Sequence, residues 1–412
     1  MKHLIMTHTL LALLIPGFGL CLGTGCTREA LIDPPVSGEL AEVSFFASAL
    51  TRADNTGPLE KDAQVRVYVY HNKTGVTTPM VDPKDYKANT AGDALEAVAP
   101  SVTPSVATES GSGDEVAGTG EATAMFLPSG SFNFYAVSTN RTPPEGSPDM
   151  TLITVPTFDT TANDGKPFMN SNSQGSDGTK GVATGLKNGI DYLHARQENQ
   201  QISFGTASQS VALNFQHVTT QVRLTIKFSA TACAASDEAA TNFANAKVFI
   251  QQTDVTNAYM RLADGMLRFA NNTETEAVTC GTDAGNLVQD QMLQMTVAKE
   301  TGSNPLGTIP ANQVATCCMM PLKAATGQEM WIKVVIEGLK VGNESSATTH
   351  TYTGKLNASN GWLAGKSNRY TLTLSGTEIA FSGVSVTDWG EGGSGGEVGN
   401  LEDNSASTAG TN

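Results

Sequence analysis

The chain has 412 residues, of which 39% are hydrophobic and only 16% carry a charge. Its formal net charge is −15 at pH 7. A nucleic-acid-binding protein needs a basic face that neutralises phosphates, so this balance argues against nucleic acid as a partner. A chain of this length can bury a sizeable core and has room for two domains.

The N-terminus has the pattern of an export signal. A basic start at Met1-Lys2-His3 is followed by an apolar run over residues 10–22. Because a transmembrane helix needs about 20 apolar residues, the run predicts a secretory signal over residues 1–25 instead. Small residues then precede Cys26, as in a bacterial lipobox, so we expect lipidation of Cys26 and anchoring in the outer membrane. Cleavage nearby by an ordinary signal peptidase is the alternative, because Leu22 lies one position too far from the cysteine.

Short strand patterns recur along the rest of the chain, and helical periodicity is nearly absent. In residues 64–70, valines alternate with Arg66 and two tyrosines. Pro128-Ser129-Gly130 separates two strand patterns and predicts a hairpin. The strand patterns lie at residues 43–47, 64–70, 124–127, 132–137, 211–215, 222–228, 247–251, 331–337, 351–356 and 370–374. Many short strands with turn signals between them predict an all-β chain built from β-sandwiches.

The strand patterns form two groups, and the gap between them predicts a domain boundary near residues 206–210. Residues 100–121 and 160–180 are rich in small polar residues and predict long loops. Residues 390–412 are rich in glycine and serine, with only Val398 and Leu401 as aliphatic residues beyond alanine. Such a segment cannot bury a core, so we expect a disordered C-terminal tail.

No residue pattern indicates catalysis. Residues 390–396 match glycine-rich phosphate-binding and nucleophile motifs by letter, but they neither follow a strand nor open a helix. No metal-ligand spacing occurs among the histidines beyond the signal, which are His71, His194, His217 and His350. His217 follows a strand pattern and is interpreted as structural. We therefore expect a protein that is not an enzyme, with no catalytic residue, cofactor or metal. A surface glycosidase built from two distant carboxylates is the alternative.

Four cysteines follow Cys26: Cys233, Cys280, Cys317 and Cys318. Export permits a disulfide, but the sequence does not choose between a pairing and free thiols. Adjacent residues on a strand face opposite sides, so Cys317 and Cys318 should point apart. Asp159-Thr160-Thr161 resembles an O-glycosylation signal of Bacteroides-type bacteria, and a simple turn is the alternative.

Several segments, taken in order, resemble the fimbrillins of Bacteroidales, which build type V pili. The resemblance covers residues 26 to about 390. Its segments are a first strand at 43–47 with Arg52-Ala53 behind it, the strand at 65–70, residues 126–140, residues 188–193 with 214–217, and residues 369–374 with 386–389. The resemblance implies two tandem β-sandwiches of transthyretin-like, Greek-key type.

The resemblance also implies a mechanism of assembly. An arginine-specific protease would cut the lipidated precursor after Arg52, so that Ala53 becomes the mature N-terminus. Residues 26–52 would then be a propeptide with the first strand, 53–208 the N-terminal sandwich and 209–389 the C-terminal sandwich. Loss of the first strand would leave an apolar groove, which a strand of a neighbouring subunit could fill by β-augmentation.

The candidate donor strand is the last strand pattern, with a bend expected at Gly383. Its apolar residues are Ile379, Phe381, Val384, Val386 and Trp389. The same pattern fits the last strand of the chain's own C-terminal domain, and that alternative stays open.

The implied partners are other pilin subunits of the same or another kind, the processing protease, the outer membrane, and ligands on host or bacterial surfaces. The implied location is the cell surface, in the outer membrane or the fimbrium. The alternative is an uncleaved, lipid-anchored fimbrillin-like protein that acts as a pilus anchor or binds a ligand or glycan. The choice between stalk, tip and anchor stays open.

Overall fold

The computed structural model describes residues 40–49, 59–73, 76, 79–98, 124–140, 155–156, 158, 182–183, 186–205, 209–229, 246–255, 258–269, 291–304, 311–339, 345–346, 348–375 and 378–388. Every element in these ranges is a β-strand, which confirms the predicted all-β class. None of the described residues forms a helix that is long and apolar enough to cross a membrane. All of them belong to one compact unit, Leu40–Asn412.

Several predictions fall on residues outside these ranges. They concern lipidation, processing, the end of the donor strand, glycosylation, two cysteines, two loops and the tail. The residues are Cys26, Arg52, Ala53, Trp389, Thr160, Cys233, Cys280, 100–121, 160–180 and 390–412.

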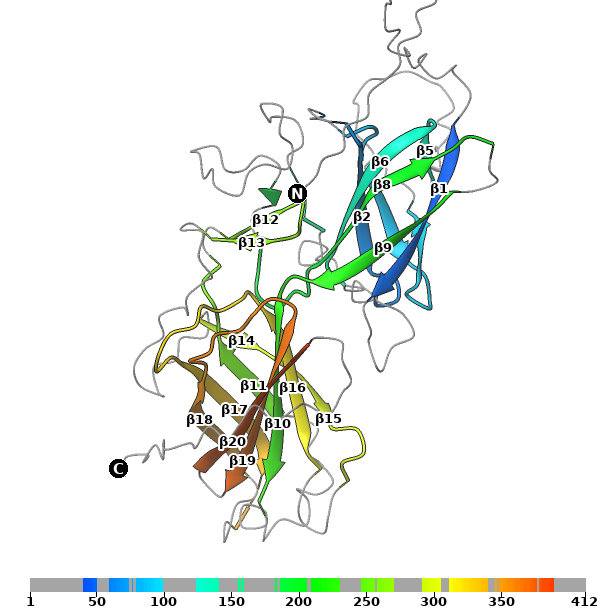
Figure 1. The fold of residues 1–412 in the computed structure, drawn as a ribbon. Helices are drawn as coiled ribbons and strands as arrows, with labels where there is room; N and C mark the ends of the chain where they lie inside the picture. The colour runs from blue at the N-terminus through cyan, green and yellow to red at the C-terminus, as the bar shows by residue number, and fades with distance from the viewer. Residues whose placement is uncertain are drawn as a thin grey trace, which may run out of the picture. The chain divides into compact units, whose positions relative to one another are not determined.

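The N-terminal half forms one eight-stranded sheet, in the order β4-β3-β2-β6-β8-β9-β1-β5 (Figure 1). β1 pairs additionally with β4, so the sheet closes on itself. Alternate side chains of its strands point inward and form a single apolar core. The strands are β1 (Ala41–Ala49), β2 (Gln64–His71), β3 (Lys84–Ala88), β4 (Ala94–Ala97), β5 (Met125–Leu127), β6 (Gly130–Ser138), β8 (Leu193–Ile202) and β9 (Gln209–His217).

The predicted hairpin at Pro128-Ser129-Gly130 is wrong. β5 pairs with β1, whereas β6 pairs with β2 and β8. Pro128 has no N–H to donate to a neighbouring strand, and β6 begins only two residues later at Gly130. The Phe204 N–H instead donates to Ser129 Oγ (2.8 Å). The segment is therefore a corner at which the chain leaves one side of the closed sheet for the other.

The C-terminal half contains two further sheets, with strand orders β15-β16-β10-β19-β20 and β14-β11-β17-β18. Both sheets contribute inward side chains to one core, in which Trp362 is fully buried and donates from Nε1 to Tyr370 Oη (2.8 Å). The strands are β10 (Thr220–Phe228), β11 (Ala246–Gln251), β14 (Met292–Gln294), β15 (Thr296–Lys299), β16 (Gln313–Met319), β17 (Glu329–Leu339), β18 (Thr348–Asn357), β19 (Lys366–Ser375) and β20 (Glu378–Asp388). A small third sheet joins β13 (Leu267–Arg268), β12 (Tyr259–Arg261) and β7 (Val182–Ala183).

The chain passes from the first sheet to the second after His217. β9 pairs with β8 and β1, and β10 opens the next sheet at Thr220. The strand pattern at residues 211–215, expected to begin the C-terminal sandwich, therefore belongs to the eight-stranded sheet.

The two adjacent cysteines on β16 face opposite sides, as predicted. Cys317 is a free thiol buried in the core, whereas Cys318 is partly exposed. Burial raises the pKa of the Cys317 thiol, so this group is protonated and unreactive.

Two glycines with nearly the same backbone provide a matched test of the C-terminal core. Gly361 has φ +69°, and a Cβ there would lie 2.4 Å from the carbonyl oxygen of Leu322; Gly327 has φ +72° and nothing within 4 Å. Alanine costs about 1–2 kcal/mol at either position because of the left-handed backbone, but only Gly361→Ala also forces two backbone segments apart. Urea unfolding should therefore show a clearly larger loss of stability for Gly361→Ala, and equal losses would contradict this packing.

Candidate functional site: the groove that holds strand β1

Strand β1 is paired along both of its edges. One edge runs parallel to β9, from the pair Val43–Gln209 to the pair Ala49–Phe215. The other edge pairs antiparallel with β5 over residues 41–43 and with β4 at residues 45–46. Within the described part of the chain, β1 is the only strand that connects β9 to β4 and β5. It fills a groove whose walls are β9 on one side and β4 with β5 on the other.

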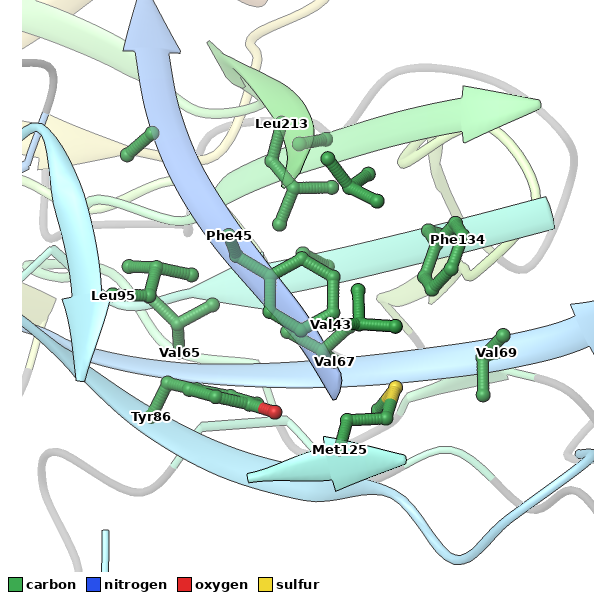
Figure 2. Close-up of a cluster of buried hydrophobic side chains, with 14 of the residues drawn as sticks. Val43, Phe45, Val65, Val67, Val69, Tyr86, Leu95, Met125, Phe134 and Leu213 are labelled. Carbon is green, nitrogen blue, oxygen red and sulfur yellow. The ribbon is translucent and has the colours of Figure 1, made fainter. Parts of the chain in front are cut away.

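The inward side of β1 carries Ala41, Val43, Phe45 and Ala47, all of them buried. Phe45 is 1% exposed and meets the rings of Tyr86 and Phe134 edge-on, at centroid distances of 5.2 and 5.7 Å (Figure 2). Burying a valine or phenylalanine side chain contributes about 1.5–3 kcal/mol, and each aromatic pair adds about 0.5–1.5 kcal/mol. The strand therefore contributes strongly to the stability of this half.

The surroundings of Phe45 are apolar, apart from one phenol. Burial raises the pKa of Tyr86 to about 12, so its hydroxyl stays protonated at physiological pH. On the opposite side of β1, Ser44 Oγ donates to the carbonyl oxygen of Gln209 (3.2 Å). Specificity for the strand at this site comes from backbone pairing and side-chain shape, because the described side chains that share this core are uncharged.

Two strands of the groove were absent from the sequence-based prediction. Tyr86 lies on β3 and Leu95 on β4, and both side chains are buried beside Phe45 (Figure 2). The strands are five and four residues long and include Lys84, Asp85 and Lys87. The alternation of β3 around Tyr86 is a signal, but it is too short to distinguish a strand from a loop.

Four of the five candidate donor residues lie on β20, in a different sheet from β1, and Trp389 lies outside the described residues. β20 pairs with β19, and the register shifts between Tyr370 and Thr371 so that Gly383 is the extra residue. This confirms the bend predicted at Gly383. Val386 is 36% exposed. Ile379, Phe381 and Val384 lie on the same strand.

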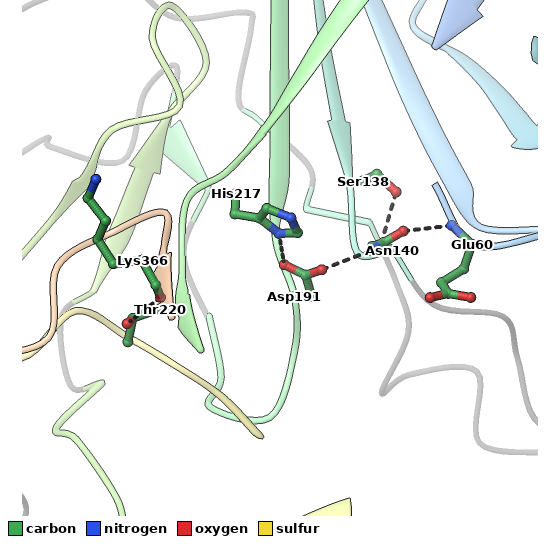
Figure 3. A network of polar contacts seen from close by, with 7 residues as sticks. All are labelled: Glu60, Ser138, Asn140, Asp191, His217, Thr220 and Lys366. Carbon is green, nitrogen blue, oxygen red and sulfur yellow. Dashed lines mark hydrogen bonds and ion pairs between the residues drawn. The ribbon is translucent and has the colours of Figure 1, made fainter. Parts of the chain in front are cut away.

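Two segments that resemble the family's domain junction meet where β9 ends. His217 Nδ1 lies 2.7 Å from Asp191 Oδ1, and Asn140 Nδ2 donates to Asp191 Oδ2 (2.8 Å) (Figure 3). Asn140 Oδ1 in turn accepts from the backbone N–H of Glu60 (2.8 Å). His217 thus has the structural role predicted for it, since it fixes the chain at the end of the strand that holds β1.

A second histidine, His194, is buried against a backbone carbonyl. His194 Nε2 lies 2.7 Å from the carbonyl oxygen of Leu262, and a Cβ on Gly265 would fall 2.4 Å from the ring. Burial lowers the pKa of His194 to about 4, so the ring is neutral at physiological pH. Among the described residues, no three His, Cys, Asp or Glu side chains converge as a metal site would require.

A family model described as fimbrillin-like matches residues 51–389. The chain belongs to the fimbrillin-like family. This confirms the resemblance seen in the sequence. No curated protein matches the chain.

Solved structures similar to this fimbrillin-like protein include a candidate cell adhesion protein of Bacteroides uniformis, with 15% identity and a TM-score of 0.45 over 86% of this chain and 100% of that one. The tip fimbrial protein Mfa3 of Porphyromonas gingivalis, truncated at its C-terminus, has 11% identity and a TM-score of 0.35, and the match covers 84% of this chain and 100% of that one. A fimbrial assembly protein of Parabacteroides distasonis has 11% identity and a TM-score of 0.33, and the match covers 85% of this chain and 96% of that one. Because these scores are below 0.5, the family assignment rests on the family model.

Adjacent phenylalanines on β1 test the contribution of the groove. Phe45→Ala removes a fully buried ring and should lower the free energy of unfolding of the precursor by about 3–5 kcal/mol. Phe46 is 47% exposed, so Phe46→Ala should change the free energy of unfolding by less than about 1 kcal/mol. Urea unfolding measures both, and similar losses would show that β1 does not pack as described.

His194 predicts a pH dependence of stability. Its pKa is about 4 in the folded protein, below the ordinary value of about 6.5, so the unfolded chain binds a proton first as the pH falls. The contribution of neutral His194 is complete above about pH 6.5 and declines towards pH 4. Between pH 7 and 5 the wild type should lose about 2 kcal/mol more unfolding free energy than His194→Gln. Parallel stability curves for the two proteins would contradict the assignment.

Proposed function

We propose that this protein is exported as a precursor lipidated on Cys26, is cut after Arg52, and forms a pilus subunit by strand exchange in adhesion. The single observation that carries the proposal is the position of β1. It is the first strand, it is paired on both edges, and it ends at Ala49, three residues before Arg52. A cut after Arg52 would separate the whole strand from the chain that holds it.

The consequence of that cut follows from the pairing. Loss of β1 would leave unpaired backbone groups on β9 and expose the apolar pocket around Phe134 and Tyr86. An edge of this kind pairs readily with an added strand. The family match begins at residue 51, so the matched region does not include β1. This supports a mature subunit without that strand.

The sequence of β20 supports its role as a donor. Residues 42–47 read Glu-Val-Ser-Phe-Phe-Ala, and residues 378–383 read Glu-Ile-Ala-Phe-Ser-Gly. Five of the six positions agree in kind: an acid, a β-branched aliphatic residue, a small residue, phenylalanine and, at the end, a small residue. A neighbouring β20 could therefore present Ile379 and Phe381 where Val43 and Phe45 lie now. Because β20 pairs with β19 in the free chain, donation requires it to give up that pairing.

The proposed division of the mature chain into two domains falls where the sheets change, after His217. The alternative function is an uncleaved, lipid-anchored surface protein that serves as a pilus anchor or binds a ligand. The closed sheet favours it in one respect, since with β1 in place the N-terminal half has a complete core.

Cleavage can be tested by mass spectrometry of the surface-exposed protein in a Bacteroides-type host. The wild type should begin at Ala53 and enter fibres, whereas Arg52→Gln should keep an acylated Cys26 and stay out of fibres. Arg196→Gln, at an exposed position on β8, is the matched control and should behave as the wild type. A wild-type surface form that begins at Cys26 would reject cleavage and favour the lipid-anchored alternative.

A further inference from the structure

Two arginines lie side by side on the outer face of the five-stranded sheet. They lie on β10 and β19, which are neighbouring strands (Figure 1). Arg223 on β10 and Arg369 on β19 are direct partners in the parallel ladder between these strands. Neighbouring strands are about 4.8 Å apart, so two like charges in this position repel unless an anion lies between them. Among the described residues, no carboxylate lies within 4.0 Å of either guanidinium, and no side chain or backbone group forms a hydrogen bond with either one.

One nitrogen of Arg369 is a buried hydrogen-bond donor that lacks an acceptor. Its Nε is shielded from water and has no hydrogen-bond partner among the described residues. Burial and the charge of Arg223 both lower the pKa of Arg369, although a guanidinium stays charged at physiological pH. A buried donor without an acceptor costs free energy, and a charged one costs more. An oxyanion bound to the exposed part of the guanidinium would supply the missing negative charge.

The neighbours of the pair are neutral and rich in hydroxyl groups. Thr316 on β16 is the cross-strand partner of Arg223, and Thr225 and Thr371 are paired two residues further along the ladder. All three are partly exposed. The strands β10, β16 and β19 contain no aspartate or glutamate at all. The chain as a whole has a net charge of −15, so three neighbouring strands without an acidic residue differ from the rest of it.

We propose that the Arg223–Arg369 pair binds an oxyanion carried by an acidic polysaccharide, either a uronate carboxylate or a sulfate ester. Guanidinium groups present parallel N–H donors that match both kinds of oxyanion. The threonine hydroxyls beside them can donate to and accept from sugar hydroxyls. The open face of a sheet suits an extended polymer better than a small molecule, which needs a concave pocket. The site is separate from the β1 groove and does not depend on cleavage after Arg52.

Binding of three polymers to the full purified chain tests the proposal and identifies the anion. Chondroitin sulfate carries sulfate and carboxylate, hyaluronan carries carboxylate alone, and dextran is neutral. The wild type should bind at least one acidic polymer and not dextran, with an affinity that falls as salt rises. Binding to hyaluronan would assign the carboxylate, and binding to chondroitin sulfate alone would assign the sulfate.

The variants show whether the two arginines form the site. Arg223→Gln and Arg369→Gln should each weaken binding at least tenfold, whereas Arg196→Gln on β8 should not change it. Absence of binding to both acidic polymers, or equal binding by all variants, would overturn the proposal.

Thermal unfolding in inorganic sulfate separates a binding role from a packing role. Sulfate should raise the Tm of the wild type and of Arg196→Gln more than that of Arg369→Gln, because a bound ligand stabilises only the folded form that binds it. Without sulfate, Arg369→Gln should unfold no earlier than the wild type, since it relieves the repulsion by Arg223. Equal sulfate shifts in all three proteins would overturn the proposal, as would a lower Tm of Arg369→Gln without sulfate.

Discussion

The N-terminal half depends on the pairing of β1 along both of its edges. β9 pairs with one edge, and β4 and β5 pair with the other, so among the described strands β1 alone closes the sheet. Its inward side chains complete the same core that Val65, Val67 and Phe134 form from neighbouring strands (Figure 2). Backbone pairing and apolar burial therefore act together at one strand, and both would be lost with it.

The position of β1 in the chain gives this dependence its functional meaning. Of the strands that the structure describes, β1 comes first in the chain, and it ends three residues before Arg52. The end of its neighbour β9 is held without β1, because β8 pairs with β9 at residues 216 and 217 and the Asp191–His217 contact fixes the same end. In the proposed exchange, this end of the groove wall would keep its place while a new strand pairs with residues 209–215.

The sequence predicted the strands whose alternation is long and apolar, and it failed where tertiary contacts decide. β2 and β10 alternate over seven or more residues and were predicted nearly to their ends. β8 reads Leu-His-Ala-Arg-Gln-Glu-Asn-Gln-Gln-Ile, which has no apolar alternation, and pairing with β6 and β9 alone makes it a strand. The hairpin was predicted from turn residues, but composition does not reveal which strand pairs with which.

In the candidate site, too, local patterns predicted some features, and contacts between distant segments decided the others. Val43 and Phe45 were visible as a short apolar strand, and the bend at Gly383 followed from the change of phase along the last strand. The parallel pairing of β1 with β9 joins residues more than 160 positions apart, and no local pattern encodes such a contact. The Arg223–Arg369 pair likewise arises from the register of two strands that are far apart in the sequence.

The central claim is that β1 fills a groove which a separate strand can occupy, and amide hydrogen exchange tests it most directly. Exchange in residues 209–215 should be slow in the precursor, fast in a chain that begins at Ala53, and slow again when a peptide of residues 41–49 is added. Exchange in β10 and β19 should stay the same in all three samples and serves as the internal control. Unchanged protection of residues 209–215 after removal of β1, or no recovery with the peptide, would contradict the account.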